Sequence, residues 1–243
     1  MPEQLWFTEF LNHHFAAAAN SLLQLVGIHP KYPSAPITNA VSMDILIVLL
    51  LLLFFLAVRA SLSVDKPGGL QHTAEALEEF LADQAHGVIG HGYERYMPYA
   101  ITLWYFILLA NVLGLVPGFE SPTARPEVPL GCAIITFVYY HFHGLRINKH
   151  RYINQFLGPV WWLAWLMFPI EFVSHFARVL SLTVRLYANI FAGDMVTLAF
   201  FSLVPVLVPV MFLGLHLFVA LVQTFIFVML TLVYLGMAVS EEH

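Results

Sequence analysis

Charged residues are scarce in this chain. Asp, Glu, Lys and Arg make up 10% of its 243 residues, whereas 60% of the sequence is apolar. A water-soluble domain carries roughly 25% charged residues, because its surface must face water. The scarcity of charge therefore excludes a water-soluble globule, and we expect lipid to cover much of the surface.

Cysteine is scarcer still, since Cys132 is the only one. A single cysteine excludes an internal disulfide and a cysteine-based metal cluster. Basic residues are missing from the first twelve positions, which carry acids instead. A cleavable signal peptide begins with a basic region, so we expect none here.

The charges that do occur are confined to short zones. The long stretches without Asp, Glu, Lys or Arg include residues 45–58, 96–119, 128–145, 152–170 and 195–240. A membrane-spanning helix needs about 20 mostly apolar residues. We therefore predict an all-α integral membrane protein with about five membrane-crossing helices and additional amphipathic surface helices.

This pattern divides the chain into two parts. Residues 1–40 mix apolar and polar side chains as an amphipathic, interfacial segment does, and residues 41–243 are expected to form a single membrane domain. Its predicted spans are about 41–62, 98–116, 130–144, 160–202 and 206–239. Residues 63–97 carry six of the 15 acidic residues together with apolar residues at helical spacing, which predicts an amphipathic helix outside the hydrocarbon.

The basic residues predict the orientation. Arg59 and Lys66 flank the end of the first span, and a cluster at 146–151 follows the third. Cytoplasmic loops carry an excess of Lys and Arg. We therefore expect the N-terminus outside and the C-terminus in the cytoplasm.

The last two apolar segments are too long for ordinary spanning helices. The 34 residues from 206 to 239 would measure about 51 Å as a helix, against a hydrocarbon layer of about 30 Å. The usual tilt of about 20° does not absorb this difference. Pro205 and Pro209 are expected to supply the turn, so we predict a long, strongly tilted helical hairpin.

Polar side chains follow one side of each of these two helices. At 100° per residue, the strongly polar residues between 171 and 189, apart from Thr183 and Tyr187, fall in a stripe about 120° wide. They are Glu171, Ser174, His175, Arg178, Ser181, Arg185 and Asn189. On the last helix, Gln223 and Tyr234 lie within about 40° of His216. Charged groups at the centre of a membrane cost about 2.5–3.5 kcal/mol each, so we interpret the stripes as functional.

Other interpretations of the stripes stay open at this level. Polar stripes also join helices through hydrogen bonds, as in a purely structural subunit. A secondary transporter with an intramembrane Arg for an anionic substrate is a further alternative, although the internal repeat common in such folds is not visible. An intramembrane hydrolase is disfavoured, because Ser174 and His175 are helix neighbours that point about 100° apart.

Two further groups are interpreted without a specific chemistry. His141 and His143 form an H-x-H pair near a cytoplasmic helix end, but a metal site would need further ligands, so we expect an interfacial polar cluster. The tryptophans at 161, 162 and 165 are typical of an interfacial aromatic belt.

Four motifs carry a resemblance to a known family. The stretch SLTVRLYANIFAGD, residues 181–194, closely resembles the signature of subunit a of the F-type ATP synthase. Residues 221–235, LVQTFIFVMLTLVYL, are similar to the last helix of that family. NVLGLVP at 111–117 and Pro-Ile-Glu at 169–171 also match its patterns. The resemblance covers residues 40–243.

This resemblance implies a proton-conducting stator beside a rotating ring of c subunits, with two offset aqueous half-channels. Carried over residue by residue, Arg185 matches the essential cation that faces the ring carboxylate. The positions matching the vicinity of Arg185 and the outer half-channel are Asn111, Asn189, Asp194, His216 and Gln223. Glu171 and Ser174 match the inner half-channel. We add His175 and Tyr234 to the candidates for proton translocation because they lie in the two stripes.

The chemistry of the residues agrees with these roles. Arg stays charged because its pKa lies above about 12, so it favours an ionised ring carboxylate yet cannot relay a proton. Asp194 lies about 180° from Arg185 around the helix, so the two need not form an ion pair. His216 on the neighbouring helix is then a possible exchange partner for Asp194.

One position departs from the family. Some members carry an acid three residues after the asparagine that matches Asn111, where this chain has Gly114. Proton access from outside is therefore expected to rely more on Asp194 and His216.

The resemblance also implies partners and a location. We expect contacts with the c-subunit ring, the subunit b peripheral stalk, other ATP synthase subunits and membrane lipid, in a bacterial plasma (inner) membrane. The chain is expected to be a non-catalytic, ion-translocating subunit, with no catalytic residue, cofactor, metal or nucleic-acid partner.

Overall fold

The computed structural model of the chain describes residues 4–25, 27, 30, 32–63, 67–116, 119–157, 164–203 and 207–239. Within these residues the fold is helical throughout and contains no strand. The α-helices are α1 (Trp6–Leu25), α2 (Asn39–Ser61), α3 (Gly69–Ile89), α4 (Met97–Leu113), α5 (Glu127–Leu157), α6 (Ala164–Leu203) and α7 (Leu207–Val239). Two short 3-10 helices, η1 (Tyr93–Arg95) and η2 (Pro122–Ala124), complete the described elements. The all-α prediction is confirmed.

Four of these helices are long and apolar enough to cross a membrane. The qualifying segments are Asn39–Ser61, Glu127–Asn148, Trp165–Phe200 and Val210–Val239. Helix α4 is equally apolar but has 17 residues, the lower end of the range for a spanning helix. The chain is thus a multi-pass membrane protein. The turn expected at Pro205 and the tryptophans at 161 and 162 lie outside the described residues.

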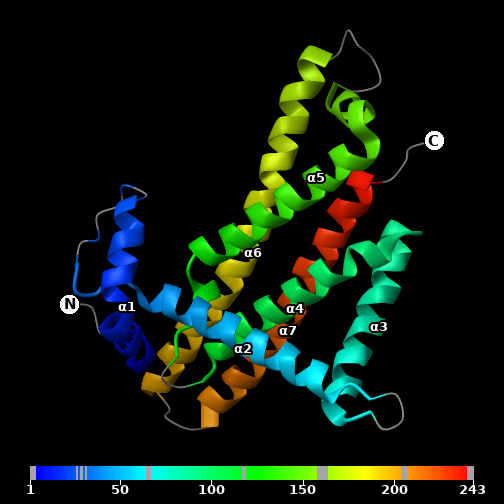
Figure 1. Cartoon of the computed structure of the whole chain (residues 1–243). Helices are drawn as coiled ribbons and strands as arrows, with labels where there is room; N and C mark the ends of the chain where they lie inside the picture. Colours follow the sequence, from blue (N-terminus) through cyan, green and yellow to red (C-terminus); the bar gives the residue numbers. More distant parts are fainter. Residues whose placement is uncertain are drawn as a thin grey trace.

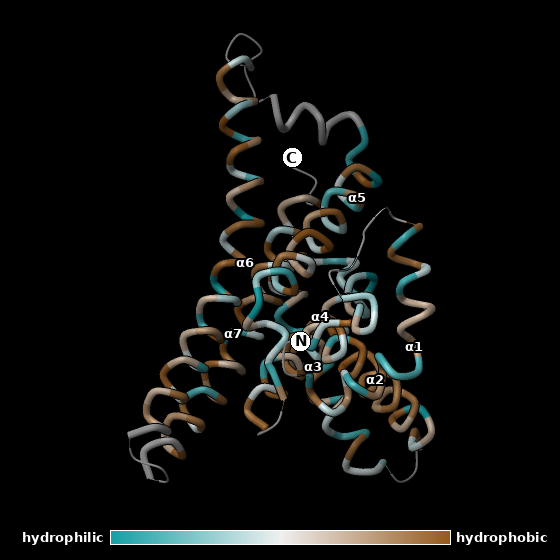
Figure 2. Tube along the Cα trace, turned by 90° about the vertical axis from the view of Figure 1, so that its left-hand side faces the viewer, coloured by the Kyte–Doolittle hydropathy of each residue, from teal (hydrophilic) through white to brown (hydrophobic). Residues whose placement is uncertain are grey.

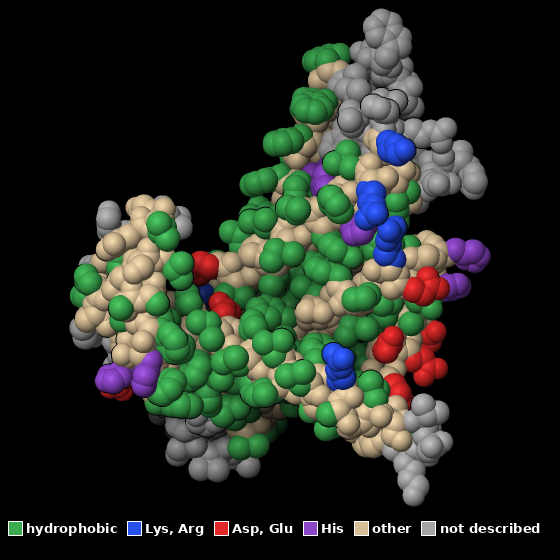
Figure 3. All heavy atoms as spheres, viewed as in Figure 1, with side chains coloured by type: hydrophobic (Ala, Val, Ile, Leu, Met, Phe, Trp, Pro, Cys, Tyr) green, Lys and Arg blue, Asp and Glu red, His purple; other side chains and the backbone are tan. Residues whose placement is uncertain are grey.

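Two amphipathic helices lie outside this bundle of apolar helices (Figure 1). Helix α1 is joined to the start of α2 by a hydrogen bond between the hydroxyls of Thr8 and Ser42, and it exposes Trp6 at its beginning. Helix α3 buries Leu81 and Ala85 against the bundle. Acidic side chains gather at the right-hand edge of the molecule, away from its hydrophobic middle (Figure 3).

Helix α5 extends beyond the expected third span of 130–144. It begins at Glu127 and continues through the basic cluster to Leu157, with a break at Lys149, where φ is 45°. A positive φ is unfavourable for a residue with a Cβ, so this residue redirects the chain. The apolar run therefore marks the part of the helix suited to lipid and not the end of the helix.

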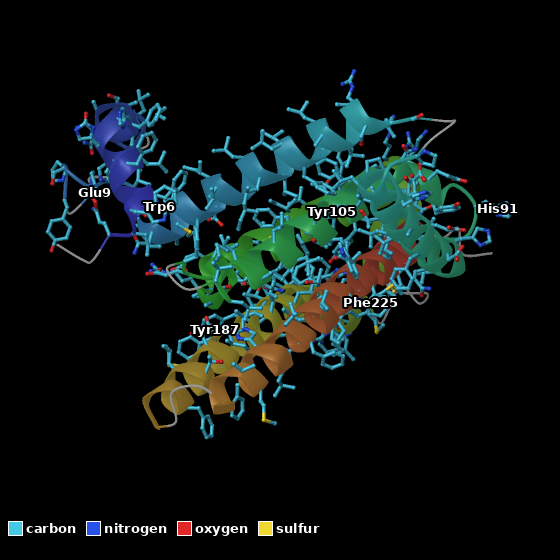
Figure 4. The ribbon with its side chains drawn as sticks, turned by 90° about the horizontal axis from the view of Figure 1, so that it is seen from below. Trp6, Glu9, His91, Tyr105, Tyr187 and Phe225 are labelled. Carbon is cyan, nitrogen blue, oxygen red and sulfur yellow. The ribbon has the colours of Figure 1, made fainter. Side chains whose placement is uncertain are left out.

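The principal core lies where α3, α4, α5, α6 and α7 meet. Phe227 and Val228 of α7 are fully buried there, as are Leu186 and Ile190 of α6. The spacing of four residues between Leu186 and Ile190 places both on one face of α6. Seen from below, α6 and α7 lie together at one edge and α2 at the opposite edge, with α4 between them (Figure 4).

Helices α6 and α7 form the long hairpin that the sequence predicts. They lie side by side where α6 ends and α7 begins and diverge toward the start of α6 and the end of α7 (Figure 1), and hydrophilic positions alternate with hydrophobic ones along α6 (Figure 2). Helix α7 has 33 residues, about 50 Å at 1.5 Å per residue. Neither helix is interrupted, so both helix axes would have to be inclined for helices of this length to fit the hydrocarbon layer.

The C-terminal end of α7 is held from two sides. A Cβ on Gly236 would lie 3.0 Å from the carbonyl oxygen of Val88 on α3, so only glycine lets the two helices approach this closely. On the α5 side, Asn148 donates its amide N–H to the carbonyl of Ala238 over 3.0 Å. Together these contacts fix α7 between α3 and α5.

Candidate functional site

The candidate residues converge on the seam between α6 and α7. Three polar contacts cross it, from Arg178 to Tyr234, from Asn189 to Gln223 and from Asp194 to His216. Residue numbers rise along α6 as those of their partners fall along α7, which is the register of an antiparallel pair. Arg178 and Asn189 of the α6 stripe therefore face Tyr234 and Gln223 of the α7 stripe, whereas Asp194, outside the α6 stripe, contacts His216.

Asn189 and Gln223 form the central contact of the seam. The Asn189 side-chain amide donates to Gln223 Oε1 over 2.8 Å. Gln223 is buried, and its Nε2 has no hydrogen-bond partner among the described residues. Buried amides are normally paired with protein or water, so this group is suited to hold a water molecule.

Asp194 and His216 form the contact nearest the α6–α7 turn. Asp194 Oδ1 and His216 Nδ1 are 3.7 Å apart, and the side chains are 25% and 3% exposed. His216 Nε2 is buried without a partner in the described part of the chain. A carboxylate beside an imidazole is a pair of proton-exchanging groups, and the carboxylate of this pair is partly exposed.

Gly193 makes this approach possible. A Cβ built there would lie 3.0 Å from Nδ1 and Cε1 of His216. Any larger residue at 193 would push the imidazole away. Glycine is therefore required by packing against His216.

Arg185 lies near the middle of α6 and is half-buried. Its Nη2 donates to Ser181 Oγ, one turn earlier, over 3.2 Å. No carboxylate of the described residues lies within ion-pair distance of it. Asp194 is engaged with His216 instead, as the angle between Asp194 and Arg185 around the helix suggests. The Arg185 guanidinium is thus available to an anion from outside the chain.

Asn111 belongs to a buried hydrogen-bond network beside the seam. Its amide donates to Thr224 Oγ1 over 3.3 Å and to the Ala220 carbonyl over 3.4 Å, both on α7. Its Oδ1 accepts from Thr123 Oγ1 over 2.7 Å, and Thr123 lies 2.9 Å from the hydroxyl of Ser121. Polar groups therefore continue from the hairpin before α5 to the neighbour of Gln223.

The space beside Gly114 is filled by this network. A Cβ on Gly114 would lie 2.4 Å from Ser121 Cβ. The acid that some family members carry at this position has no room here. The glycine and the serine are therefore a matched pair in this chain.

A second polar group surrounds the first half of α6. Glu171 Oε1 and His175 Nε2 are 3.4 Å apart. His175 Nδ1 lies 3.1 Å from the hydroxyl of Tyr140 on α5. Ser174 is half-buried on the same helix. The His141 ring packs against the His175 ring at 4.8 Å between centroids, so His141 belongs to this group.

Tyr234 joins this group to α7. The Arg178 guanidinium carbon lies 5.2 Å from the centre of its ring, a distance typical of a cation–π contact. Tyr140 is 6.1 Å from the same ring, centroid to centroid. The structure therefore brings Glu171, His175, Arg178 and Tyr234 together with Tyr140.

Sequence reasoning missed several of these residues. Ser121 and Thr123 stand in a proline-rich connection, where hydroxyl residues are usual turn formers. Tyr140 stands in a run of aromatics without a distinguishing spacing. Asp44 lies near the beginning of α2, and its Oδ1 is buried without a hydrogen-bond partner among the described residues. The signal that marks Asp44 is a carboxylate inside a predicted span, directly before the uncharged stretch 45–58.

Comparison with known proteins bears on the identity of the chain. The family model for the ATP synthase A chain matches residues 40–236. ATP synthase subunit a of Koribacter versatilis (strain Ellin345) is 57% identical over 244 residues, covering 100% of both chains. The subunit a of Solibacter usitatus (strain Ellin6076) is 47% identical over 96% of this chain and 99% of its own length.

A more distant relative matches a shorter part of the chain. ATP synthase subunit a of Sulfurimonas denitrificans is 44% identical over 180 residues, which cover 73% of this chain and 80% of the relative. With the helical bundle and the α6–α7 seam already described, these matches leave one assignment. The chain belongs to the ATP synthase subunit a family and is part of the membrane sector of an ATP synthase.

Proposed function

We propose that the chain carries protons across the membrane as the stationary partner of a ring of c subunits, through two offset half-channels that meet at Arg185. The observation that carries this proposal is the position of Arg185. A half-buried guanidinium lies at mid-helix without an ion-pair partner in the described part of the chain, between two separate polar groups.

An arginine in this position attracts a carboxylate and blocks direct proton flow between the half-channels. It remains charged at every physiological pH, so it favours the ionised form of a carboxylate that passes by it. Because it does not release its proton, it also prevents protons from running directly between the half-channels. A carboxylate on the ring would therefore load and unload on opposite sides of Arg185.

The outer half-channel is proposed to follow the Asn111 network and the Asp194–His216 pair. Hydroxyl and amide groups lead from Ser121 through Asn111 to Thr224, next to Gln223. Gln223 contacts Asn189, which is one helical turn from Arg185. Asp194 and His216 supply the groups that exchange protons.

The inner half-channel is proposed to follow the first half of α6. Glu171 is partly exposed and His175 is close to it, so protons can reach this pair from water. Ser174 and Tyr234 line the same side. The two half-channels are displaced along α6, with Arg185 between them.

The proposal includes the surroundings of the chain. We place it in a bacterial plasma membrane with its N-terminus outside and its C-terminus in the cytoplasm. Its partners are the c-subunit ring, the subunit b peripheral stalk and other subunits of the complex. The nucleotide chemistry belongs to those other subunits, and this chain contributes ion translocation.

Arg185→Lys in the assembled complex tests the proposal. Lysine keeps a charge but loses the planar guanidinium and can release its proton when buried. We expect ATP-driven proton pumping in inverted membrane vesicles to be abolished, although the chain still inserts. Arg59→Lys, at the exposed C-terminal end of α2 and away from both polar groups, is the matched control and should pump. Full pumping by Arg185→Lys would contradict the proposed role.

Accessibility of single cysteines tests the two half-channels separately. In a Cys132→Ser background, cysteines near Asp194 and His216 should react with a membrane-impermeant thiol reagent added outside. Cysteines near Glu171 and Ser174 should react with the same reagent added from the cytoplasmic side. A single side from which both groups are labelled would contradict offset half-channels.

A further inference from the structure

We propose that Tyr140 is a positioning residue of the inner proton path. Its hydroxyl holds the imidazole of His175 so that this ring exchanges protons with Glu171. The inference rests on the proposed function of the chain and assigns a role on α5 to a path otherwise built on α6 and α7.

The geometry links three side chains in a row. Tyr140 Oη lies 3.1 Å from His175 Nδ1, and His175 Nε2 lies 3.4 Å from Glu171 Oε1. The two ring nitrogens of His175 therefore face different partners, one on α5 and one on its own helix. A ring held at both nitrogens cannot rotate about its own axis without losing a contact.

Burial separates the roles of the three side chains. Tyr140 is 2% exposed and His175 is 9% exposed, whereas the Glu171 side chain is 32% exposed. Only Glu171 has substantial access to the surface. Tyr140 is enclosed by the bundle, so its hydroxyl orients the His175 ring and does not exchange protons with the surface.

The hydroxyl of Tyr140 suits both protonation states of His175. A neutral imidazole has one donor and one acceptor nitrogen. When the phenol donates to Nδ1, the proton of His175 lies on Nε2 and points to the carboxylate of Glu171. When His175 is protonated, Nδ1 donates and the phenol oxygen accepts. The hydroxyl hydrogen rotates between these states while the heavy atoms keep their places.

Other titratable and charged groups surround His175. His141 packs against it from α5, and Arg178 and Glu171 stand on its own helix. Tyr234 of α7 lies beyond Tyr140 and under Arg178. Both His141 and Arg178 add positive potential when charged, so the pH at which His175 exchanges depends on all of them. The contribution of Tyr140 must therefore be isolated by a matched comparison.

Tyr140→Phe is the informative substitution because it removes one oxygen and keeps the ring. Tyr99→Phe is its matched control. Tyr99 also forms a side-chain hydrogen bond, to Thr136 Oγ1 over 2.8 Å, but it has no contact with His175. Both variants lose one phenol hydrogen bond within the bundle, and only one of these bonds belongs to the proposed path.

The measurement is passive proton conductance against cytoplasmic-side pH, in inverted vesicles with the whole membrane sector. Loss of an ordinary hydrogen bond corresponds to about 0.4–1 pH unit in a titration midpoint. We expect Tyr140→Phe to move the midpoint by about this amount and to lower conductance several-fold, whereas Tyr99→Phe leaves the midpoint in place. The pH midpoint of the conductance does not depend on how much of the chain is assembled, so it can be measured even if less complex is obtained.

A second substitution shows whether the effect acts through His175. In a His175→Gln background, Tyr140→Phe should move the midpoint no further, because the group that it positions is gone. A shift that persists in that background, or an unchanged midpoint in Tyr140→Phe alone, would overturn the inference. The proposed function fails on a different result, namely pumping by Arg185→Lys, so the two failures are distinguishable.

Discussion

Gly193→Ala should slow proton translocation although it adds a single methyl group. The added Cβ would lie 3.0 Å from two ring atoms of His216, whereas ordinary contacts begin at 3.4 Å. The imidazole must therefore give way by a few tenths of an ångström. His216 is 4% exposed, so the ring has little free space into which it can move.

The size of the effect follows from this displacement. A misplacement of 1 Å at a reacting group can cost about 100-fold in rate. A shift of a few tenths of an ångström should accordingly lower proton flux roughly 3- to 10-fold. Alanine is a better helix former than glycine by about 1 kcal/mol, so the substitution should not weaken α6 itself.

Gly214→Ala is the control, because nothing lies within 4 Å of a Cβ at that position. ATP-driven pumping and passive conductance would be compared in inverted vesicles, at equal amounts of chain copurified with the ring. We expect Gly214→Ala to match the parent and Gly193→Ala to fall below it in both assays. Equal flux in the two variants would refute the argument that Gly193 sets the position of His216.

Other substitutions test separate parts of the structure. Asp194→Asn and His216→Gln should each lower passive proton conductance, and the double variant should lose less than the combined single losses because the two groups share one path; strictly independent losses would contradict this. Gly114→Asp should reduce the amount of assembled complex on immunoblots through its clash with Ser121, and Ser121→Gly in the same chain should restore it. Phe227→Ala empties a fully buried site and should cost about 3–5 kcal/mol, seen as a lower thermal midpoint of the solubilised complex; an unchanged midpoint would contradict its place in the core.

Much of the helical architecture could be predicted from the sequence, because the hydrocarbon layer restricts which structures can cross it. Apolar runs reveal spanning helices, since a backbone in hydrocarbon must satisfy its own hydrogen bonds. Asn189 and Gln223 belong to the polar stripes of two adjacent antiparallel helices, and these positions are consistent with their contact. Angular position around a helix is enough to predict such a pairing once the partner helix is known.

Contacts that depend on loop conformation and on close packing could not be predicted from the sequence. The fit of Gly114 against Ser121 depends on how the hairpin before α5 folds back, and no periodicity encodes that path. The continuation of α5 past residue 144 was missed because hydropathy records the boundary of the lipid, whereas a helix can continue in water. Tyr140 was missed because it lies outside the two polar stripes, on a helix whose packing against α6 the sequence does not indicate.

The contacts at the C-terminal end of α7 have a mechanical consequence. Under the proposed function, a ring turning against α6 and α7 would exert a force on them, and an unsupported pair of helices would be displaced by it. Close-packed protein interiors have low compressibility, so the approach of Gly236 to Val88 and the Asn148–Ala238 hydrogen bond pass that force into α3 and α5. If the proposed function holds, helix α3 would act as a rigid support that resists displacement of α7.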